Sequence, residues 1–441
     1  MEQKKIIIAG LGSAGFAALV TIKRINPKAH VVVIDPKDKD IVHPCGLTYA
    51  LEGKVNEQDL QQDIFLSRMN VEKVKGIVHS VDAEKKEIAI QYDDKTITLQ
   101  FDTIILCTGY KPQLPPIAGI EHYIHKGVYT LSSIDDLKRI KNDIQGKGRA
   151  IVIGAGAIGL EVACGLKAHG LTVTVIEAKE VLPQAVDSDM AQLVAQYCAN
   201  QNIAFITHSP VTAIEKRDSE FSIRTPEKEY TADIVIVATG FAANCEWAIN
   251  SSFETGKWGV VVNEHLEIKP SIYAAGDCIQ NWSVIDNKPF AVKLATSAYK
   301  QGIVAAEHAM GLNSAYKGTA GTFVTKVGEL EIAATGFSTQ VAQERGFSVI
   351  AGKISATVKP EYFPENERLT FKVLCDTKGK LLGAQAIGNG AAARINIISL
   401  AIEHGLTIDD ILPFEMAYCP AVSEVNDILF KACEFAKRRI K

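Results

Sequence analysis

Two copies of one glycine pattern constrain this chain more than any other feature of its sequence. One copy of G-x-G-x-x-G runs from Gly10 to Gly15, and the other runs from Gly154 to Gly159. Each follows a short apolar run typical of a buried strand and leads into a stretch with helical character. Glycines at this spacing permit a tight turn and let the backbone approach a pyrophosphate, which then lies on the N-terminus of the helix.

Each copy is followed by an acidic residue that ends a second apolar run. The run Val31–Ile34 leads into Asp35, and Leu171–Ile176 leads into Glu177. A carboxylate at this position accepts a hydrogen bond from an adenosine ribose hydroxyl. The repeated combination of strand, glycines, helix and acid predicts two dinucleotide-binding sites.

The order of these segments predicts an α/β protein with two Rossmann-like dinucleotide-binding domains and a C-terminal α+β domain. The run Asp102–Gly109 closes the first unit, and Ala232–Gly240 repeats its pattern at the end of the second. A chain of 441 residues is long enough for two or three domains. We place the first domain at 1–111 and 244–318, the second at 112–243 and the third at 319–441.

The third domain alternates strand-like and helical stretches and carries no nucleotide signature. We expect strands at Leu369–Leu374 and Leu381–Ile387, and helices at Ala391–His404 and Ser423–Lys437. The apolar run Ser271–Asp277, which precedes a further helix, is expected to return the chain to the first domain.

Composition excludes several classes of protein. The formal net charge of −4 gives no reason to expect nucleic acid or an acidic membrane surface as a partner. Nine cysteines without a C-x-x-C pair indicate no disulfide framework and no metal site, which fits the cytoplasm. Lys4 and Lys5 followed by an apolar stretch resemble a signal peptide, but the glycine spacing and Asp35 explain the same residues better. No transmembrane helix is expected.

With the Thr-Gly strand ends and the segment Ala275-Gly276-Asp277, these features resemble the flavin-dependent pyridine nucleotide–disulfide oxidoreductases. The resemblance implies FAD in the first site, NADH or NADPH in the second, and a homodimer formed through the third domain. Glu177 favours NADH because it would repel a 2′-phosphate, whereas Lys179 leaves room for NADPH. The cofactor-binding residues expected from the motifs and the resemblance are Gly10, Gly12, Ser13, Ala14, Asp35, Pro44, Val78, Thr108, Gly109, Asp277, Ala295, Gly154, Gly156, Ala157, Ile158, Gly159, Glu177 and Gly240.

Cys45 is the candidate redox residue. It is followed by Gly-Leu-x-Tyr, and Ala50 stands where a second cysteine of C-x-x-x-x-C would lie. This pattern resembles the branch of coenzyme A–disulfide reductases, NADH oxidases, NADH peroxidases and persulfide or polysulfide reductases. Cys45 also begins a short helical run, where a helix N-terminus lowers a thiol pKa. We predict structural roles for the cysteines at Cys107, Cys164, Cys198, Cys278 and Cys375.

Further positions bear on the substrate. Ser13 stands where oxidases and peroxidases of this branch carry a catalytic histidine. Tyr362 and Tyr418 match tyrosines that the disulfide-reducing members place over the partner's cysteine, where a phenol protonates or anchors a thiolate. Cys419 replaces the family's usual alanine, and we hypothesise that it exchanges with Cys45 across the dimer. Two basic residues are either coenzyme A phosphate ligands or solvated charges, namely Lys23 and Arg24.

We therefore predict an FAD-dependent NAD(P)H oxidoreductase that reduces a disulfide, persulfide or polysulfide through Cys45. Small thiols, coenzyme A among them, are the expected substrates. Two alternatives stay open, an NADH oxidase that makes peroxide or water and a reductase of a small electron carrier. A non-enzymatic flavin-binding sensor is a further alternative.

Overall fold

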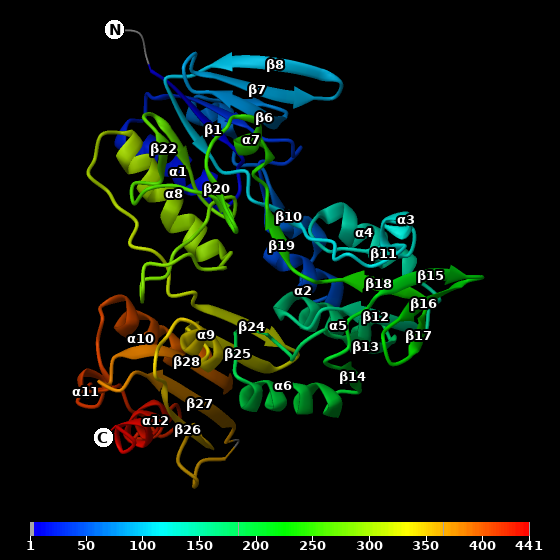
Figure 1. Cartoon of the computed structure of the whole chain (residues 1–441), viewed down its shortest axis with the longest axis vertical. Coiled ribbons are helices and arrows are strands. Elements are labelled where there is room, and N and C mark those ends of the chain that lie inside the picture. The colour runs from blue at the N-terminus through cyan, green and yellow to red at the C-terminus, as the bar shows by residue number, and fades with distance from the viewer. Residues whose placement is uncertain (1–3, 184, 365, 441) are drawn as a thin grey trace. The chain divides into compact units, whose positions relative to one another are not determined.

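The computed structural model describes residues 4–183, 185–364 and 366–440. Within these ranges the chain forms two compact units, whose elements are labelled in Figure 1. One unit contains the residues up to Pro44 together with Glu57–Gln113 and Phe241–Thr319. The other contains Cys45–Asn56, Leu114–Gly240 and the residues from Ala320 onward. The three-domain boundaries given above stay a prediction.

The first unit is built on a six-stranded sheet in the order β22-β23-β9-β1-β2-β5. All its neighbouring strands are parallel except β22 and β23. The strands are Glu267–Lys269 (β22), Ile272–Ala274 (β23), Thr103–Leu106 (β9), Lys5–Ala9 (β1), His30–Ile34 (β2) and Val71–Val74 (β5). Nearly every side chain of the central strands is buried, as expected for strands covered on both faces.

Helices α1 (Ser13–Ile25) and α8 (Ala295–Ala309) pack against each other in this unit (Figure 1). A side chain at Gly302 of α8 would place its Cβ 2.1 Å from the Ala14 oxygen of α1. Glycine is therefore required for this close approach. The pairing of the two helices holds the start of α1, which carries the first glycine motif.

Small antiparallel sheets complete the first unit. One of them is an antiparallel ribbon formed by Tyr110–Pro112 (β10) and Phe241–Ala243 (β19). The remaining elements of this unit are Ile41–Val42 (β3), Gln61–Gln62 (β4), Ile77–Asp82 (β6), Glu87–Tyr92 (β7), Lys95–Gln100 (β8), Thr255–Gly256 (β20), Gly259–Val260 (β21), Glu246–Asn250 (α7) and the 3₁₀ turns Glu57–Leu60 and Leu66–Met69.

The second unit repeats the dinucleotide fold with the parallel sheet β11-β18-β12-β13-β14. Its strands are Val128–Tyr129 (β11), Ile234–Val237 (β18), Arg149–Ile153 (β12), Thr172–Ile176 (β13) and Ile203–Ile206 (β14). The accompanying elements are Leu47–Glu52 (α2), Ile120–Tyr123 (α3), Ile134–Asp143 (α4), Ala157–Ala168 (α5), Ser188–Asn200 (α6), Ala213–Arg217 (β15), Glu220–Arg224 (β16) and Glu229–Ala232 (β17).

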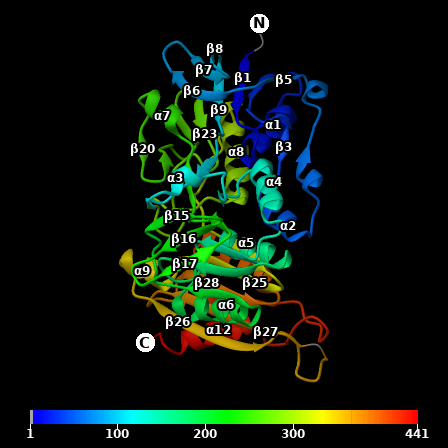
Figure 2. The same ribbon diagram turned by 90° about the vertical axis from the view of Figure 1, so that its right-hand side faces the viewer.

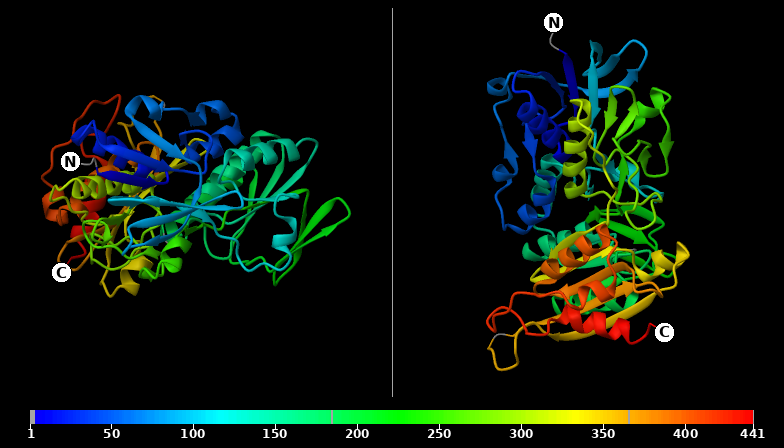
Figure 3. Two further views of the ribbon diagram at one scale, coloured as in Figure 1. Left: turned by 90° about the horizontal axis from the view of Figure 1, so that it is seen from above. Right: turned by 90° about the vertical axis from the view of Figure 1, so that its left-hand side faces the viewer.

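The C-terminal part of this unit is an antiparallel sheet in the order β24-β25-β28-β27-β26. Its strands are Phe323–Val327 (β24), Leu330–Gly336 (β25), Leu381–Gly388 (β28), Arg368–Cys375 (β27) and Ile350–Thr357 (β26), and its helices are Thr339–Glu344 (α9), Ala391–Glu403 (α10), Ile408–Ile411 (α11) and Ile428–Lys437 (α12). Helix α10 packs on β25 and β28, whereas α12, red in Figures 2 and 3, packs on β26 and β27.

The predicted strands and helices of the C-terminal part are confirmed, except that the last helix begins at Ile428 and not at Ser423. Asp427 caps this helix by accepting from the Leu429 amide, and the buried Arg394 guanidinium binds the same carboxylate at 2.6 Å. The chain before Asp427 therefore forms a loop. Among the helices of the described residues, none combines the length and apolar character that a membrane crossing requires.

Candidate functional site

The first glycine motif, Gly10–Gly15, forms a loop that we call the first cradle. Each of its glycines is required for a different structural reason. Gly10 has a φ of +99°, and a Cβ on it would lie 2.2 Å from the Cys107 oxygen. A Cβ on Gly15 would lie 1.9 Å from the Gly10 oxygen. At Gly12, by contrast, no atom of the described chain other than those of its two chain neighbours lies within 4 Å of such a Cβ. Gly12 therefore leaves the N-terminus of α1 accessible to a ligand, which the predicted pyrophosphate requires.

The acid that ends β2 is tied to this cradle. The buried Asp35 carboxylate accepts from the Leu11 amide at 2.6 Å and from the Lys37 amide at 2.8 Å. Lys37 Nζ also donates to it at 2.5 Å. The carboxylate is thus fixed beside the glycine loop, where the sequence predicts the adenosine ribose.

The second motif reproduces this geometry. A Cβ on Gly154 would lie 2.4 Å from the Ala238 oxygen, one on Gly159 would lie 2.0 Å from the Gly154 oxygen, and Gly156 again has no atom within 4 Å among the described residues. Glu177 accepts from the Ala155 amide at 2.7 Å and from the Lys179 amide at 2.9 Å. The internal repeat inferred from sequence therefore extends to individual hydrogen bonds.

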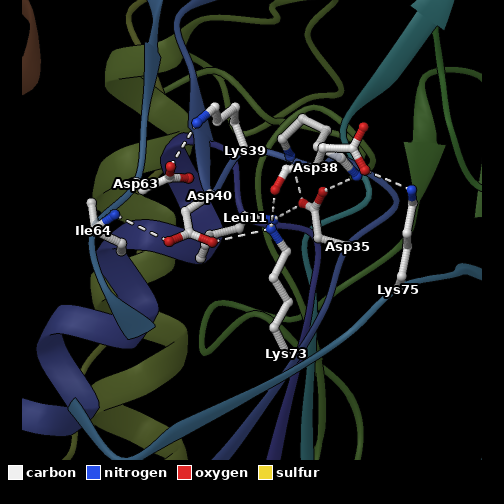
Figure 4. A network of polar contacts seen from close by, with 10 residues as sticks. Leu11, Asp35, Asp38, Lys39, Asp40, Asp63, Ile64, Lys73 and Lys75 are labelled. Carbon is white, nitrogen blue, oxygen red and sulfur yellow. Dashed lines mark hydrogen bonds and ion pairs between the residues drawn. The ribbon is translucent and has the colours of Figure 1, made fainter. Parts of the chain in front are cut away.

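Beyond Asp35, ion pairs fix the segment that leads toward Cys45 (Figure 4). Lys73 Nζ lies 3.1 Å from the Asp40 carboxylate, which also accepts from the Ile64 amide. Lys75 pairs with Asp38 at 2.6 Å and holds the pKa of that carboxyl below its usual range. Because Asp40 is buried, its pairing limits the freedom of the chain that follows.

Thr108 and Gly109 follow β9 at the edge where the strands of the first sheet end. The Thr108 hydroxyl donates to the Asn244 oxygen at 2.6 Å and accepts from the Trp247 indole at 2.9 Å. Gly109 has a φ of +72°. Among the other residues expected to contact FAD, Ser13 and Ala14 open α1, and Ala295 opens α8. Pro44 begins the 3₁₀ turn Pro44–Gly46, and Val78 lies in β6 against the core.

Asp277 follows β23 and is half-buried. Burial raises the pKa of its carboxyl, and the nearby Lys293 ammonium lowers it. Among the described residues, no side chain or amide donates a hydrogen bond to this carboxylate. A half-buried acid of this kind fits a polar ligand with hydroxyl groups, such as the ribityl chain of FAD. Together with the accessible face at Gly12, it makes the first unit suited to FAD.

Cys45 lies in the 3₁₀ turn Pro44–Gly46, directly before α2, and its side chain is exposed. Of the nine cysteines, Cys45 and Cys419 are exposed, whereas the others are buried or half-buried. Burial raises the pKa of those other thiols, which fits the structural roles predicted for five of them. The redox role of Cys45 stays a prediction.

Tyr362 and Tyr418, predicted from separate motifs, are brought together. The interaction of the Tyr418 hydroxyl with the Tyr362 side chain is the main cause of the raised pKa of Tyr418. Tyr362 is 75% exposed and Tyr418 is 48% exposed. Val422 and Val425 are also exposed, and they lie in the loop before α12 that carries Tyr418 and Cys419. Exposed aromatic and apolar groups of this kind are typical of an interface.

The two basic residues at the end of α1 differ in their surroundings. Lys23 donates to the Ala29 oxygen at 2.8 Å and to the Asn70 oxygen at 3.2 Å, and burial lowers its pKa. Arg24 is 68% exposed and lies 3.4 Å from Glu307. Neither contact tests the predicted binding of coenzyme A.

The second unit contains a cavity of about 610 Å³, and its lining includes Ala178, the residue that follows Glu177. Lys179 and His208 line it from the dinucleotide fold, and Lys372 lines it from β27. The Lys372 ammonium binds Asp187 at 2.7 Å and Asp189 at 2.8 Å, so its charge is already compensated. Beside Glu177, this wall carries both a cation at Lys179 and a further acid at Glu180.

Sequence reasoning missed Glu161, which lies on α5 two residues beyond the second glycine motif. Its carboxylate accepts from the Thr48 hydroxyl at 2.7 Å, the Thr325 hydroxyl at 2.6 Å and the Tyr49 hydroxyl at 3.3 Å. Thr48 and Tyr49 belong to α2, the helix that follows Cys45. Glu161 thus fixes α2 to α5 and β24. In the sequence, the local signal for this residue was an acid two positions after the second glycine motif.

Glu161→Ala is expected to reduce the free energy of unfolding by about 2–4 kcal/mol, because three hydroxyls lose a charged acceptor. Glu161→Gln should cost less, since its amide oxygen still accepts. The urea midpoint, followed by circular dichroism, measures both changes. Glu121→Ala, which alters an exposed acid of the same unit, is the control. Equal midpoints for the variants at 161 and 121 would contradict a role for Glu161 in fixing α2.

Comparison with protein families gives two matches along the chain. Residues 4–302 match the family model for pyridine nucleotide-disulphide oxidoreductases, and residues 322–428 match the dimerisation domain of the same family. The second match supports a homodimer formed by the C-terminal part.

Individual relatives cover almost the whole chain. An "NADH oxidase" of Methanocaldococcus jannaschii is 32% identical and covers 99% of both chains. An "NAD(P)H sulfur oxidoreductase (CoA-dependent)" of Pyrococcus furiosus is 30% identical over 97% of this chain and 98% of its own. The solved structure of an "NAD-Dependent Persulfide Reductase from A. fulgidus" is 30% identical, covers 99% of this chain and 83% of that chain, and superposes with a TM-score of 0.94.

The family match, the two glycine cradles and the shared fold all indicate the same family. This chain therefore belongs to the pyridine nucleotide-disulphide oxidoreductase family, whose members use FAD and NAD(P)H.

Proposed function

We propose that this protein reduces a disulfide, persulfide or polysulfide at the expense of NADH, with Cys45 as its redox thiol. The observation that carries the proposal is the exposed position of Cys45 at the turn before α2, in a chain with two complete dinucleotide cradles. The names of the Pyrococcus furiosus and A. fulgidus relatives support sulfur chemistry. Exposed thiols also favour the reducing cytoplasm as its location.

In this proposal, the two cradles bind the coenzymes and Cys45 reacts with the substrate. Gly154–Gly159 and Glu177 would hold NADH, and Gly10–Gly15, Asp35 and Asp277 would hold FAD. Bound FAD would pass the two electrons of the NADH hydride to the sulfur–sulfur bond formed on Cys45, which releases the second sulfur as a thiol and restores the Cys45 thiolate. The Cys45 thiolate attacks the S–S bond of the substrate, so that a new bond joins Cys45 Sγ to one sulfur and the other leaves as a thiolate.

We further propose that Tyr418, with Tyr362, lies over Cys45 of the other subunit. A tyrosine phenol is protonated at neutral pH, as a donor to the departing thiolate must be, and the pKa of Tyr418 is raised further by its interaction with Tyr362. The exposure of both tyrosines on the part of the chain that matches a dimerisation domain supports this placement. Coenzyme A is one candidate thiol, with Arg24 the more accessible of the two proposed phosphate ligands.

The second candidate function is an NADH oxidase, which the name of the Methanocaldococcus jannaschii relative favours. Against it, Ser13 occupies the first position of α1, where oxidases of this branch carry a histidine. Anaerobic assays with coenzyme A disulfide or polysulfide, compared with assays in air without them, separate the two. We expect NADH consumption to require the sulfur compound and to continue without oxygen. Consumption that requires oxygen and ignores both sulfur compounds would overturn the proposal.

A further inference from the structure

Lys293 is a half-buried lysine between two residues that we expect to contact FAD, Asp277 and Ala295. Its ammonium donates to the main-chain oxygen of Asp277 at 2.6 Å and to that of Trp258 at 3.1 Å. Burial lowers the pKa of Lys293, and the Asp277 carboxylate opposes that shift. Withdrawing a lysine from water costs free energy, so a lysine retained here has local partners that favour its charge.

Few negatively charged groups surround Lys293. Lys293 comes directly before Leu294, the N-cap residue of α8, and this 15-residue helix has no acidic side chain in its first turn. The N-terminus of a helix carries a partial positive charge. The titratable side chains that interact with Lys293 are Asp277, Cys245 and Cys278. Burial raises the pKa of both cysteines, so Asp277 is the acid that balances Lys293.

We propose that Lys293 is a positioning residue of the FAD site, whose ammonium fixes Asp277 and raises the reduction potential of the bound flavin. Reduction adds negative charge to a flavin, and a fixed positive charge nearby favours the more negative state. A purely structural donor would hold the same two carbonyl oxygens without changing the potential. The inference rests on the proposed occupation of the first cradle by FAD, and it adds a residue that the motifs do not contain.

The test compares Lys293→Met and Lys293→Arg with the unmodified holoenzyme. The flavin is reduced in the presence of a dye of known potential, and both absorbances are followed. For Lys293→Met, we expect the ratio of reduced to oxidised flavin at a given dye potential to fall about tenfold, which is about 30 mV for a two-electron couple. Lys293→Arg should restore most of the potential because it restores the charge. Lys300→Met, which alters an exposed lysine of α8, should leave it unchanged.

An FAD-loaded Lys293→Met protein with an unchanged potential would overturn the proposal. If that variant does not retain FAD, Lys293→Gln keeps a donor without the charge and serves in its place. A potential equal to that of the unmodified protein in Lys293→Gln would then overturn it as well. The measurement uses no sulfur substrate, so a failure to reduce disulfides leaves this inference standing. An unmodified protein that binds no FAD would instead refute the proposed function.

Discussion

Replacing Cys45 with serine is expected to abolish the NADH-dependent reduction of disulfides while the protein stays folded and loaded with FAD. The rate should fall by more than about 10³-fold, because a serine hydroxyl neither ionises near neutral pH nor forms a bond that thiol exchange can break. Cys45 is exposed in a 3₁₀ turn, so the substitution removes no core packing. Anaerobic NADH oxidation with coenzyme A disulfide or polysulfide as acceptor measures the loss.

Two other cysteines make the Cys45 experiment specific. Cys164→Ser changes a half-buried thiol on α5 and should retain activity. Cys419→Ser changes the other exposed thiol, and it tests whether a disulfide with Cys45 links two chains on a non-reducing gel after mild oxidation. If Cys45→Ser still reduces disulfides at the normal rate, Cys45 is incidental and transfer to a small electron carrier becomes the better account.

The second large effect concerns the middle glycine of each motif. Gly156→Ala is expected to raise the KM for NADH by about 10²-fold, with FAD content and thermal stability unchanged. Apart from its two chain neighbours, no described residue has an atom within 4 Å of this Cβ, so the fold accepts it. The methyl group would instead occupy the face that a pyrophosphate must approach. Steady-state kinetics and the flavin absorbance measure the two properties separately.

The first motif supplies the reciprocal control. Gly12→Ala should weaken FAD binding while the stability of the apoprotein is retained, because its Cβ is equally unobstructed. Gly15→Ala and Gly159→Ala should unfold their units instead, since their Cβ atoms would lie 1.9 Å and 2.0 Å from backbone oxygens. A normal KM for NADH in Gly156→Ala would show that the dinucleotide does not lie on this loop.

Local sequence patterns were sufficient to predict the elements that build the two cradles. The strands before and after each motif lie where the apolar runs place them, because a parallel strand buried on both faces leaves a continuous apolar signal. The short ribbon of β10 and β19 was not predicted. Its two strands are only three residues long, and one of them contains Pro112. They also pair with each other although they lie far apart in the sequence.

The contacts around Glu161 escaped prediction for a related reason. Thr48, Thr325 and Glu161 belong to segments that are distant in sequence, so their meeting depends on how α2, α5 and β24 pack. The start of α12 was misplaced because a single capping carboxylate, Asp427, set it rather than the apolar pattern. Which residues act on the substrate was inferred from resemblance, since neither periodicity nor spacing identifies a sulfur compound.

The near identity of the two cradles has a consequence for how their occupants are sorted. Asp35 and Glu177 present the same pair of backbone amide contacts, and the middle glycines are equally accessible. The adenylate half that both coenzymes share therefore has two equivalent binding sites in one chain. Whether a coenzyme stays bound at one site or exchanges at the other must therefore depend on the residues around its flavin or nicotinamide half. ADP, which carries only the shared half, should compete for both sites.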